Sequence, residues 1–218
     1  MIGFVKTDHK VRKLDSMMMP NSLERGILME EKCAKAVRVL TVPSMFSALL
    51  CTILYLRLSG AFTSEWHYFA ALCFLSFLPL MSYPICHAVP ALREKGRKAE
   101  RNLSLVFSVA GYAGGILFCL LTDSRPIEKL LYATYLLSGL GLAVCSLMHF
   151  HASGHACGCS GPIIFLSVLI SPWFLLGYVL LGVVMWASRN LDRHSPAQLV
   201  GGSVVPVVAF LGCMHWIL

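Results

Sequence analysis

Residues 161–187 read GPIIFLSVLISPWFLLGYVLLGVVMWA, a stretch without a charged side chain. One continuous helix over these residues would be roughly 40 Å long, whereas two helices over residues 155–171 and 173–188, separated at Pro172, would each be about 24 Å long. Proline removes a backbone donor and clashes with the preceding helical turn, so the sequence predicts a turn between two helices at Ser171-Pro172-Trp173. This turn decides the topology, because it sends the chain back to the side of the membrane from which residue 161 departs.

Apolar character extends over most of the chain. Of the 218 residues, 57% are hydrophobic and 13% are charged, whereas about a quarter of the residues of soluble domains are charged. Seven stretches are candidates for crossing a hydrocarbon layer of ~30 Å, namely residues 39–56, 67–88, 103–122, 130–148, 155–171, 173–188 and 195–217. We therefore expect an all-α, polytopic membrane helical bundle with about six to seven transmembrane helices, and the composition excludes a water-soluble enzyme.

A polar segment, residues 1–37, precedes the single membrane domain, residues 38–218. The segment has no apolar core followed by a small-residue cleavage site, so no signal peptide is expected. From Asn21 onward, a capping-box-like start with Glu24 and a rough helical period of apolar residues predict an interfacial helix that leads into the first span.

The positive charges are distributed unevenly. The net charge of +7 comes from 18 Lys and Arg against 11 Asp and Glu, and a turn at Pro172 places all but three of those cations on one side. The three on the other side are Arg57, Arg125 and Lys129. Because cytoplasmic loops of membrane proteins are rich in Lys and Arg, we expect the cation-rich side to face the cytoplasm, in a membrane such as the inner membrane of a bacterium.

Three of the eight histidines lie within seven residues, at His149, His151 and His155. Ionisable side chains at membrane depth are costly and are often functional, so this cluster is a candidate site. Cys157 and Cys159 follow closely, and imidazole and thiolate at short spacing also suit zinc or copper. Metal binding or transfer is therefore an alternative function.

Two further polar segments lie on the cation-rich side. In residues 188–198, a helix beginning near Ser195-Pro196 would bring the Gln198 amide beside the ring of His194. In the loop from Arg93 to Arg101, guanidinium groups match phosphate oxygens. The positive-inside rule alone also accounts for such a basic loop.

Ser153-Gly154-His155-Ala156, followed by Ser188-Arg189 and by His194-x-Pro196-x-Gln198, resembles the type 2 phosphatidic acid phosphatase superfamily of membrane phosphatases. The family motifs are K-x6-R-P, P-S-G-H and S-R-x5-H-x3-D, and the resemblance is best over residues 150–202. It implies that His194 attacks phosphorus and that His155 protonates the leaving oxygen. It also implies that Ser153, Gly154 and Arg189 hold the phosphate.

The chain departs from the family pattern at several positions. Gln198 stands where the family has Asp, four residues separate Arg189 from His194 where five are usual, and Ala152 stands where the family has Pro. The first motif is absent. Arg125-Pro126 supplies only its dipeptide and lies on the opposite side, so the run from Lys95 to Arg101 is the better substitute.

The resemblance implies a membrane-embedded phosphatase-like hydrolase that acts on a lipid phosphate or pyrophosphate through a phosphohistidine intermediate. Its expected partners are membrane lipids and the phosphorylated lipid substrate, without nucleic acid, metal or other cofactor. Such an enzyme requires the rings of His155 and His194 to face one cavity, which Arg189 is expected to line. A metal-binding or transport protein and a catalytically inactive relative are the alternatives.

Overall fold

The computed structural model of the protein describes residues 22–218, which are helical almost throughout and contain no strand. Residues 1–21 lie outside this range, and with them the expected absence of a signal peptide and the proposed helix start at Asn21. Within the described range the all-α bundle predicted from the sequence is confirmed.

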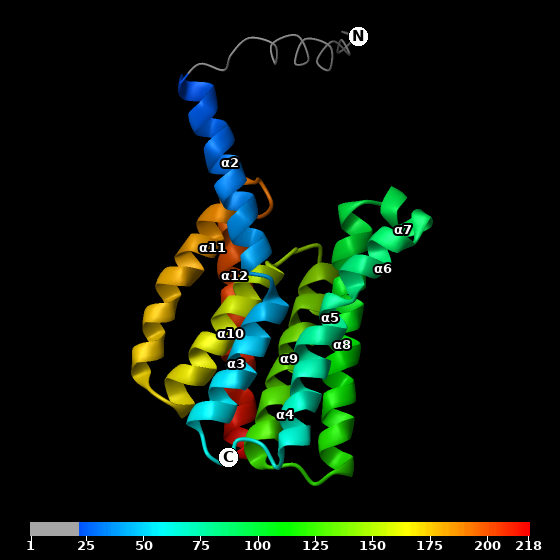
Figure 1. The fold of residues 1–218 in the computed structure, drawn as a ribbon, viewed down its shortest axis with the longest axis vertical. Helices are drawn as coiled ribbons and strands as arrows, with labels where there is room; N and C mark the ends of the chain where they lie inside the picture. The colour runs from blue at the N-terminus through cyan, green and yellow to red at the C-terminus, as the bar shows by residue number, and fades with distance from the viewer. Residues whose placement is uncertain (1–21) are drawn as a thin grey trace.

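The helices run back and forth along one long axis (Figure 1). They are α3 (Pro43–Arg57), the nearly continuous unit of α4 (Glu65–Leu72), η1 (Cys73–Phe77), α5 (Leu78–Leu80) and α6 (Ser82–Ala88), then α8 (Arg97–Leu121), α9 (Pro126–Leu147), α10 (Gly154–Leu169), η2 (Pro172–Gly177) with α11 (Tyr178–Asn190), and α12 (Pro196–Ile217). Among the described residues, five helical units are long and apolar enough to cross a membrane, and the pair of α2 (Ser22–Leu40) and α3 would be a sixth. Helix α10 is apolar but shorter.

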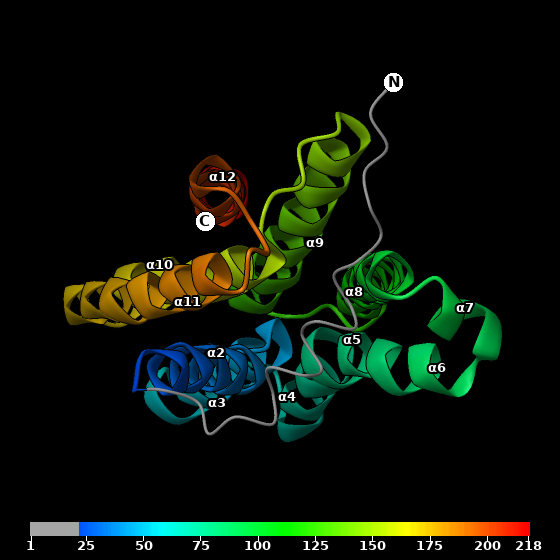
Figure 2. The ribbon, with the colours of Figure 1, turned by 90° about the horizontal axis from the view of Figure 1, so that it is seen from above.

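Prolines start several of these elements. A proline at the first helical turn loses no hydrogen bond, since the first amide groups of a helix have no partner within it, and its fixed φ suits the helix. The described elements that begin in this way start at Pro43, Pro90, Pro126, Pro172 and Pro196. The short helix α7 (Pro90–Glu94) is one of them, and with α6 it projects away from the other helices (Figure 2).

The predicted turn at Ser171-Pro172-Trp173 is confirmed. Helix α10 ends at Leu169, Ser171 is extended with φ −163° and ψ 136°, and Pro172 begins the 3-10 segment η2 that leads into α11. Helices α10 and α11 therefore form an antiparallel pair (Figure 1). The start of α10 and the end of α11 lie at the same end of the bundle, as the resemblance requires.

The first span begins later than the sequence indicates. Thr41 and Val42 separate α2 from α3, with a bend of 47° between the two helices. Helix α2 packs against α11 and extends beyond the bundle (Figure 1). Arg38, which the sequence assigns to the membrane domain, consequently belongs to the last turn of α2.

The apolar core fills the end of the bundle opposite His155 and His194. Fully buried side chains from α3, α9, α10 and α12 meet there, among them Leu50, Leu54, Leu130, Phe165 and Phe210. At the other end, α12 lies close to the start of α10. A Cβ atom added at Gly202 would collide with the backbone of Ser153, so only glycine permits this approach.

Candidate functional site

A cavity of about 640 Å³ begins at the cation-rich end and extends down between the helices. Its mouth combines histidines with positive charges, carried by α2, α8, the connection between α9 and α10, α10, and the connection between α11 and α12. The residues there are Arg38, Lys98, Glu100, Arg101, His151, Gly154, His155, Arg193 and His194. These residues are far apart in sequence, and the hairpin of α10 and α11 brings those around His155 and His194 to the same end of the bundle.

His194 lies in the connection between α11 and α12 and is partly buried. Its Nδ1 atom is 3.2 Å from the carbonyl oxygen of His151. A carbonyl oxygen can only accept a hydrogen bond, so Nδ1 of the neutral ring carries the proton and donates it. The Nε2 atom then keeps its lone pair, which is the form of imidazole that can act as a nucleophile.

The segment after His194 is fixed by a capping box at the start of α12. The Ser195 hydroxyl accepts a hydrogen bond from the backbone amide of Gln198 at 3.3 Å. The side-chain oxygen of Gln198 accepts one from the backbone amide of Ser195 at 3.0 Å. The carbonyl oxygen of Gln198 in turn accepts a hydrogen bond from the Ser153 amide at 2.9 Å. These bonds join the connection between α11 and α12, which carries His194, to the start of α10.

The charge state of His194 is shifted toward neutral. Burial, and next the positive charge of Arg38, lower the pKa of the His194 ring below its usual value of 6.5. Hydrogen bonds to the His151 carbonyl and to the Gln198 side chain act in the opposite direction. Because the net effect is a lower pKa, the ring is neutral at pH 7 and its Nε2 lone pair is available.

His155 is presented at the cavity mouth as the second residue of α10. Ser153 is the N-cap, its buried hydroxyl accepting a hydrogen bond from the Ala156 amide at 3.3 Å. Nδ1 of His155 is 3.4 Å from a guanidinium nitrogen of Arg38. Arginine can only donate, so Nδ1 is the acceptor and Nε2 of the neutral ring carries the proton. The two histidines thus offer complementary atoms, a lone pair on His194 and an N–H on His155.

Arg38 connects three elements at the cavity mouth. One of its guanidinium nitrogens donates to the hydroxyl of Ser188 at 2.9 Å, and the other contacts His155. Ser188 is completely buried on α11. Sequence reasoning counted Arg38 only as one cation of its side, since its partners lie more than a hundred residues away. The helix break just after it is the one local signal that could have pointed to it.

Some residues indicated by the resemblance line the cavity and others do not. His194, His155, Gly154 and Arg101 line it. Ser153 and Gln198 lie behind it, in the capping bonds that hold the two loops. Lys95 is exposed outside it, and Lys98 is the lysine at the mouth.

The structure departs from the sequence expectation at Arg189. This side chain is exposed, and its guanidinium group lies 3.5 Å from the His194 carbonyl oxygen without lining the cavity. The reason is local: α11 ends at Asn190 and the chain turns back, with the Arg193 amide donating to the Ser188 carbonyl at 3.0 Å. This turn brings Arg193 to the cavity in place of Arg189.

No family model, no curated protein and no solved structure matches this chain. The functional assignment therefore depends on the site geometry and on the motif resemblance.

The metal alternative lacks a ligand set in residues 22–218, where no three His, Cys, Asp or Glu side chains are grouped closely enough to hold an ion. His149 points to solvent from a left-handed backbone conformation with φ 60°. Cys157 and Cys159 are buried as free thiols. The short spacing in sequence therefore does not become a short spacing in space.

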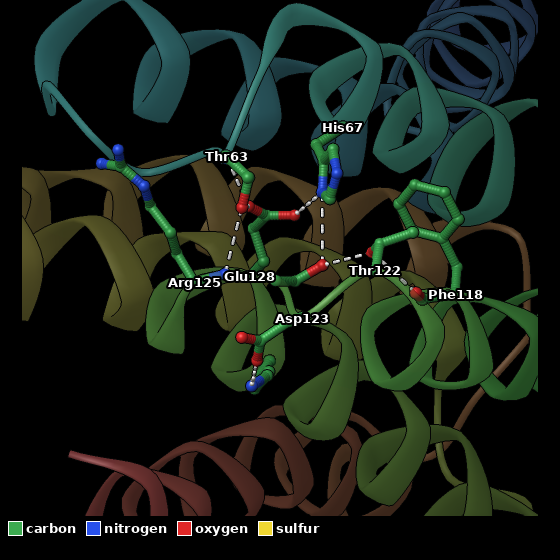
Figure 3. A network of polar contacts seen from close by, with 9 residues as sticks. Thr63, His67, Phe118, Thr122, Asp123, Arg125 and Glu128 are labelled. Carbon is green, nitrogen blue, oxygen red and sulfur yellow. Dashed lines mark hydrogen bonds and ion pairs between the residues drawn. The ribbon is translucent and has the colours of Figure 1, made fainter.

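A second polar cluster, which sequence reasoning missed, is drawn in Figure 3 and lies where α4 and α9 begin, at the opposite end of the bundle (Figure 1). Glu128, 1% exposed, accepts hydrogen bonds from the amide and the hydroxyl of Thr63, the latter at 2.6 Å. Its other oxygen is 2.6 Å from Nδ1 of His67, which also lies 3.2 Å from the Ser124 hydroxyl. The cluster ties the connection before α4 to the first turn of α9. A carboxylate two residues after the helix-starting Pro126 was its only sequence signal.

Proposed function

We propose that the protein is a membrane-embedded phosphatase that hydrolyses a lipid phosphate or pyrophosphate through a phosphohistidine intermediate. The observation that supports this most strongly is the pair of complementary histidine nitrogens at one cavity whose mouth also carries Arg38, Lys98, Arg101 and Arg193. A nucleophile, a proton donor and cations for the phosphoryl oxygens are the parts that such a displacement needs.

In the first step, the Nε2 lone pair of His194 forms a bond to phosphorus while the bond from phosphorus to the leaving oxygen breaks. The leaving oxygen takes that electron pair and receives the Nε2 proton of His155 in its doubly protonated, cationic form, which becomes a neutral ring. His155 takes up the second proton on Nδ1 when the negative phosphate binds, in place of the hydrogen bond from Arg38 and against burial of the ring and the charge of Arg38. In the second step, water attacks the phosphohistidine, His155 accepts its proton, and inorganic phosphate leaves.

The His151 carbonyl supplies the orienting hydrogen bond that the family obtains from an Asp at the position of Gln198. It fixes the proton on Nδ1 of His194 without contributing a full negative charge. A weaker stabilisation of the positively charged intermediate follows, so turnover slower than that of a carboxylate-assisted enzyme is expected. A relative that binds phosphate without hydrolysing it is the alternative that this substitution favours.

A lipid substrate is favoured because the cavity mouth lies where helices of a membrane bundle end, and because its lower part enters the bundle. The excess of cations at that end favours a cytoplasmic site, in a membrane such as the inner membrane of a bacterium. The phosphate would then be drawn from lipids of the cytoplasmic leaflet.

The direct test is phosphate release from lipid phosphates by the protein reconstituted in vesicles. Arg38→Ala should lower kcat/KM by about 10²-fold or more, since one charge stabilising the phosphoryl oxygens is lost. Lys35→Ala is the matched control: it removes the same charge one turn earlier on α2, from an exposed pair with Glu31. Absence of wild-type turnover over several head groups, or an equal loss in both variants, would contradict the proposal.

The pH profile should reflect the lowered pKa of His194. Attack needs the neutral ring, so kcat/KM falls as pH drops through that pKa, and the midpoint of this acid limb should lie below pH 6.5. In Arg38→Ala the midpoint of the residual activity should move upward, because a cation that disfavours the charged ring is gone. Ionisation of the substrate is the same in both profiles, so identical midpoints would argue against His194 as the titrating group.

A further inference from the structure

Below its mouth, the cavity changes character. The charged residues give way to aromatic, aliphatic and small side chains from α8, α9, α10 and α12. These lower residues include Leu105, Tyr112, Tyr135, Leu142, Phe165 and Pro206. No positive charge lies among the residues that line this part. The phosphate chemistry described above uses only the mouth, which leaves the lower chamber without a role.

The depth of the lower chamber follows from its helices. Arg101 at the mouth and Tyr112 at the bottom are eleven residues apart on α8, which corresponds to roughly 16 Å of helix. His155 and Phe165 are ten residues apart on α10, which corresponds to roughly 15 Å. Two helices therefore give the same depth, about half of a ~30 Å hydrocarbon layer.

The floor of the chamber is aromatic and belongs to the packed core. Phe165 is completely buried, and its ring centroid is 4.9 Å from that of Phe210 on α12. Tyr112 and Tyr135 pack edge to face at 5.3 Å. On the far side, these rings meet the buried side chains of the core. Any group that enters the chamber is stopped at this layer.

The walls combine apolar side chains with hydroxyl groups, of which the buried hydroxyl of Tyr135 has no hydrogen-bond partner. Gly139, Gly158 and Gly161 line the cavity without a side chain, and at Gly158 an added Cβ atom would collide with Pro43, so glycine there permits α3 to pack closely against α10. The hydroxyl of Ser138 donates to the carbonyl oxygen of Thr134 at 2.7 Å, so it needs no partner from a ligand. The total volume of about 640 Å³ lies within the range of 300–1,000 Å³ typical of small-molecule sites. It is suited to a phosphate with one chain.

We propose that the lower chamber is a chain-length gauge for a single-chain lipid phosphate, with Phe165 setting the limit. An extended chain advances by about 1.2 Å per bond, so the chamber accommodates about twelve carbons below the phosphate. The identity of the head group in this proposal rests on the proposed function, whereas the length limit does not depend on turnover. A longer chain must fold back or draw the phosphate away from the histidines.

The test measures binding of n-alkyl phosphonates of six to eighteen carbons to the protein in lipid nanodiscs, with affinity expressed as mole fraction in the bilayer. A phosphonate has a P–C bond that this chemistry cannot hydrolyse. In the bilayer each added carbon is already removed from water, so affinity should stay nearly constant up to the limit. Beyond it, at sixteen carbons, affinity should fall by about tenfold or more, because the packed floor does not yield.

Smaller and larger side chains at position 165 should move the limit on alkyl chain length in opposite directions. Phe165→Ala should shift it upward by several carbons, Phe165→Leu should shift it less, and Phe165→Trp should shift it downward. Tyr135→Phe is the control, because it removes a hydroxyl but keeps the ring that forms the floor. Phe165→Leu preserves a buried apolar side chain and keeps the test possible if the alanine variant does not fold.

The outcomes separate the two proposals. A length limit that moves with Phe165, found in a protein that hydrolyses nothing, supports the gauge and overturns the phosphatase assignment. Turnover of lipid phosphates with no length limit, or with a limit that is the same in every Phe165 variant, supports the phosphatase and overturns the gauge.

Discussion

His194→Ala should abolish turnover, reducing phosphate release from a lipid phosphate by about 10³-fold or more. The loss is this large because the variant has no atom that can form the bond to phosphorus. With a ³²P-labelled substrate and an alkaline quench, the wild-type chain should carry label on histidine, and His194→Ala should carry none. His149→Ala is the matched control, since that ring is exposed and lies outside the cavity.

Labelling of His194→Ala at wild-type level would place the nucleophile elsewhere. His151 would be the next candidate, because its ring lines the cavity and its Nδ1 is buried without a hydrogen-bond partner. Full turnover in His194→Ala without any labelled protein would indicate direct attack by water, and would contradict the covalent mechanism.

Glu128→Ala should lower the free energy of unfolding by about 3–5 kcal/mol, because three donors lose their acceptor at about 1–3 kcal/mol each. The amide and hydroxyl of the exposed residue Thr63 and the buried ring of His67 would all lose their acceptor. Unfolding by titration with SDS in mixed micelles measures the change. Glu128→Gln should cost less, since it keeps one oxygen acceptor.

Glu65→Ala is the control for this stability change, because it removes the same charge from an exposed position at the same end of the bundle. If Glu128→Ala unfolds no more readily than Glu65→Ala, the cluster does not hold the connection before α4 to α9. The histidine cavity lies at the opposite end, so the folded fraction of Glu128→Ala should keep its turnover.

The topology could be predicted from the sequence because a few local signals determine it. Charge-free stretches give the helices, and Pro172 converts one apolar run into a hairpin. That hairpin places His155 and His194 at the same end of the bundle. Two motifs about forty residues apart in the sequence therefore line one cavity.

Residues whose position depends on long-range contacts could not be predicted in this way. Arg38 reaches His155 only because α2 packs along α11. Arg193 lines the cavity in place of Arg189 because α11 ends at Asn190, a difference of one helical turn that no spacing rule resolves. Glu128 looked like an ordinary acidic residue at a helix start, since its partners belong to a different connection.

The hydrogen bond from the Ser153 amide to the Gln198 carbonyl has a consequence for biosynthesis. A chain is made from its amino terminus, so His155 and His194 are synthesised before α12 is in place. Until then, Ser153 lacks this partner, the capping box after His194 cannot form, and Gly202 does not yet press against the start of α10. The nascent protein therefore carries its reactive side chains unassembled, and packing of α12 completes the site.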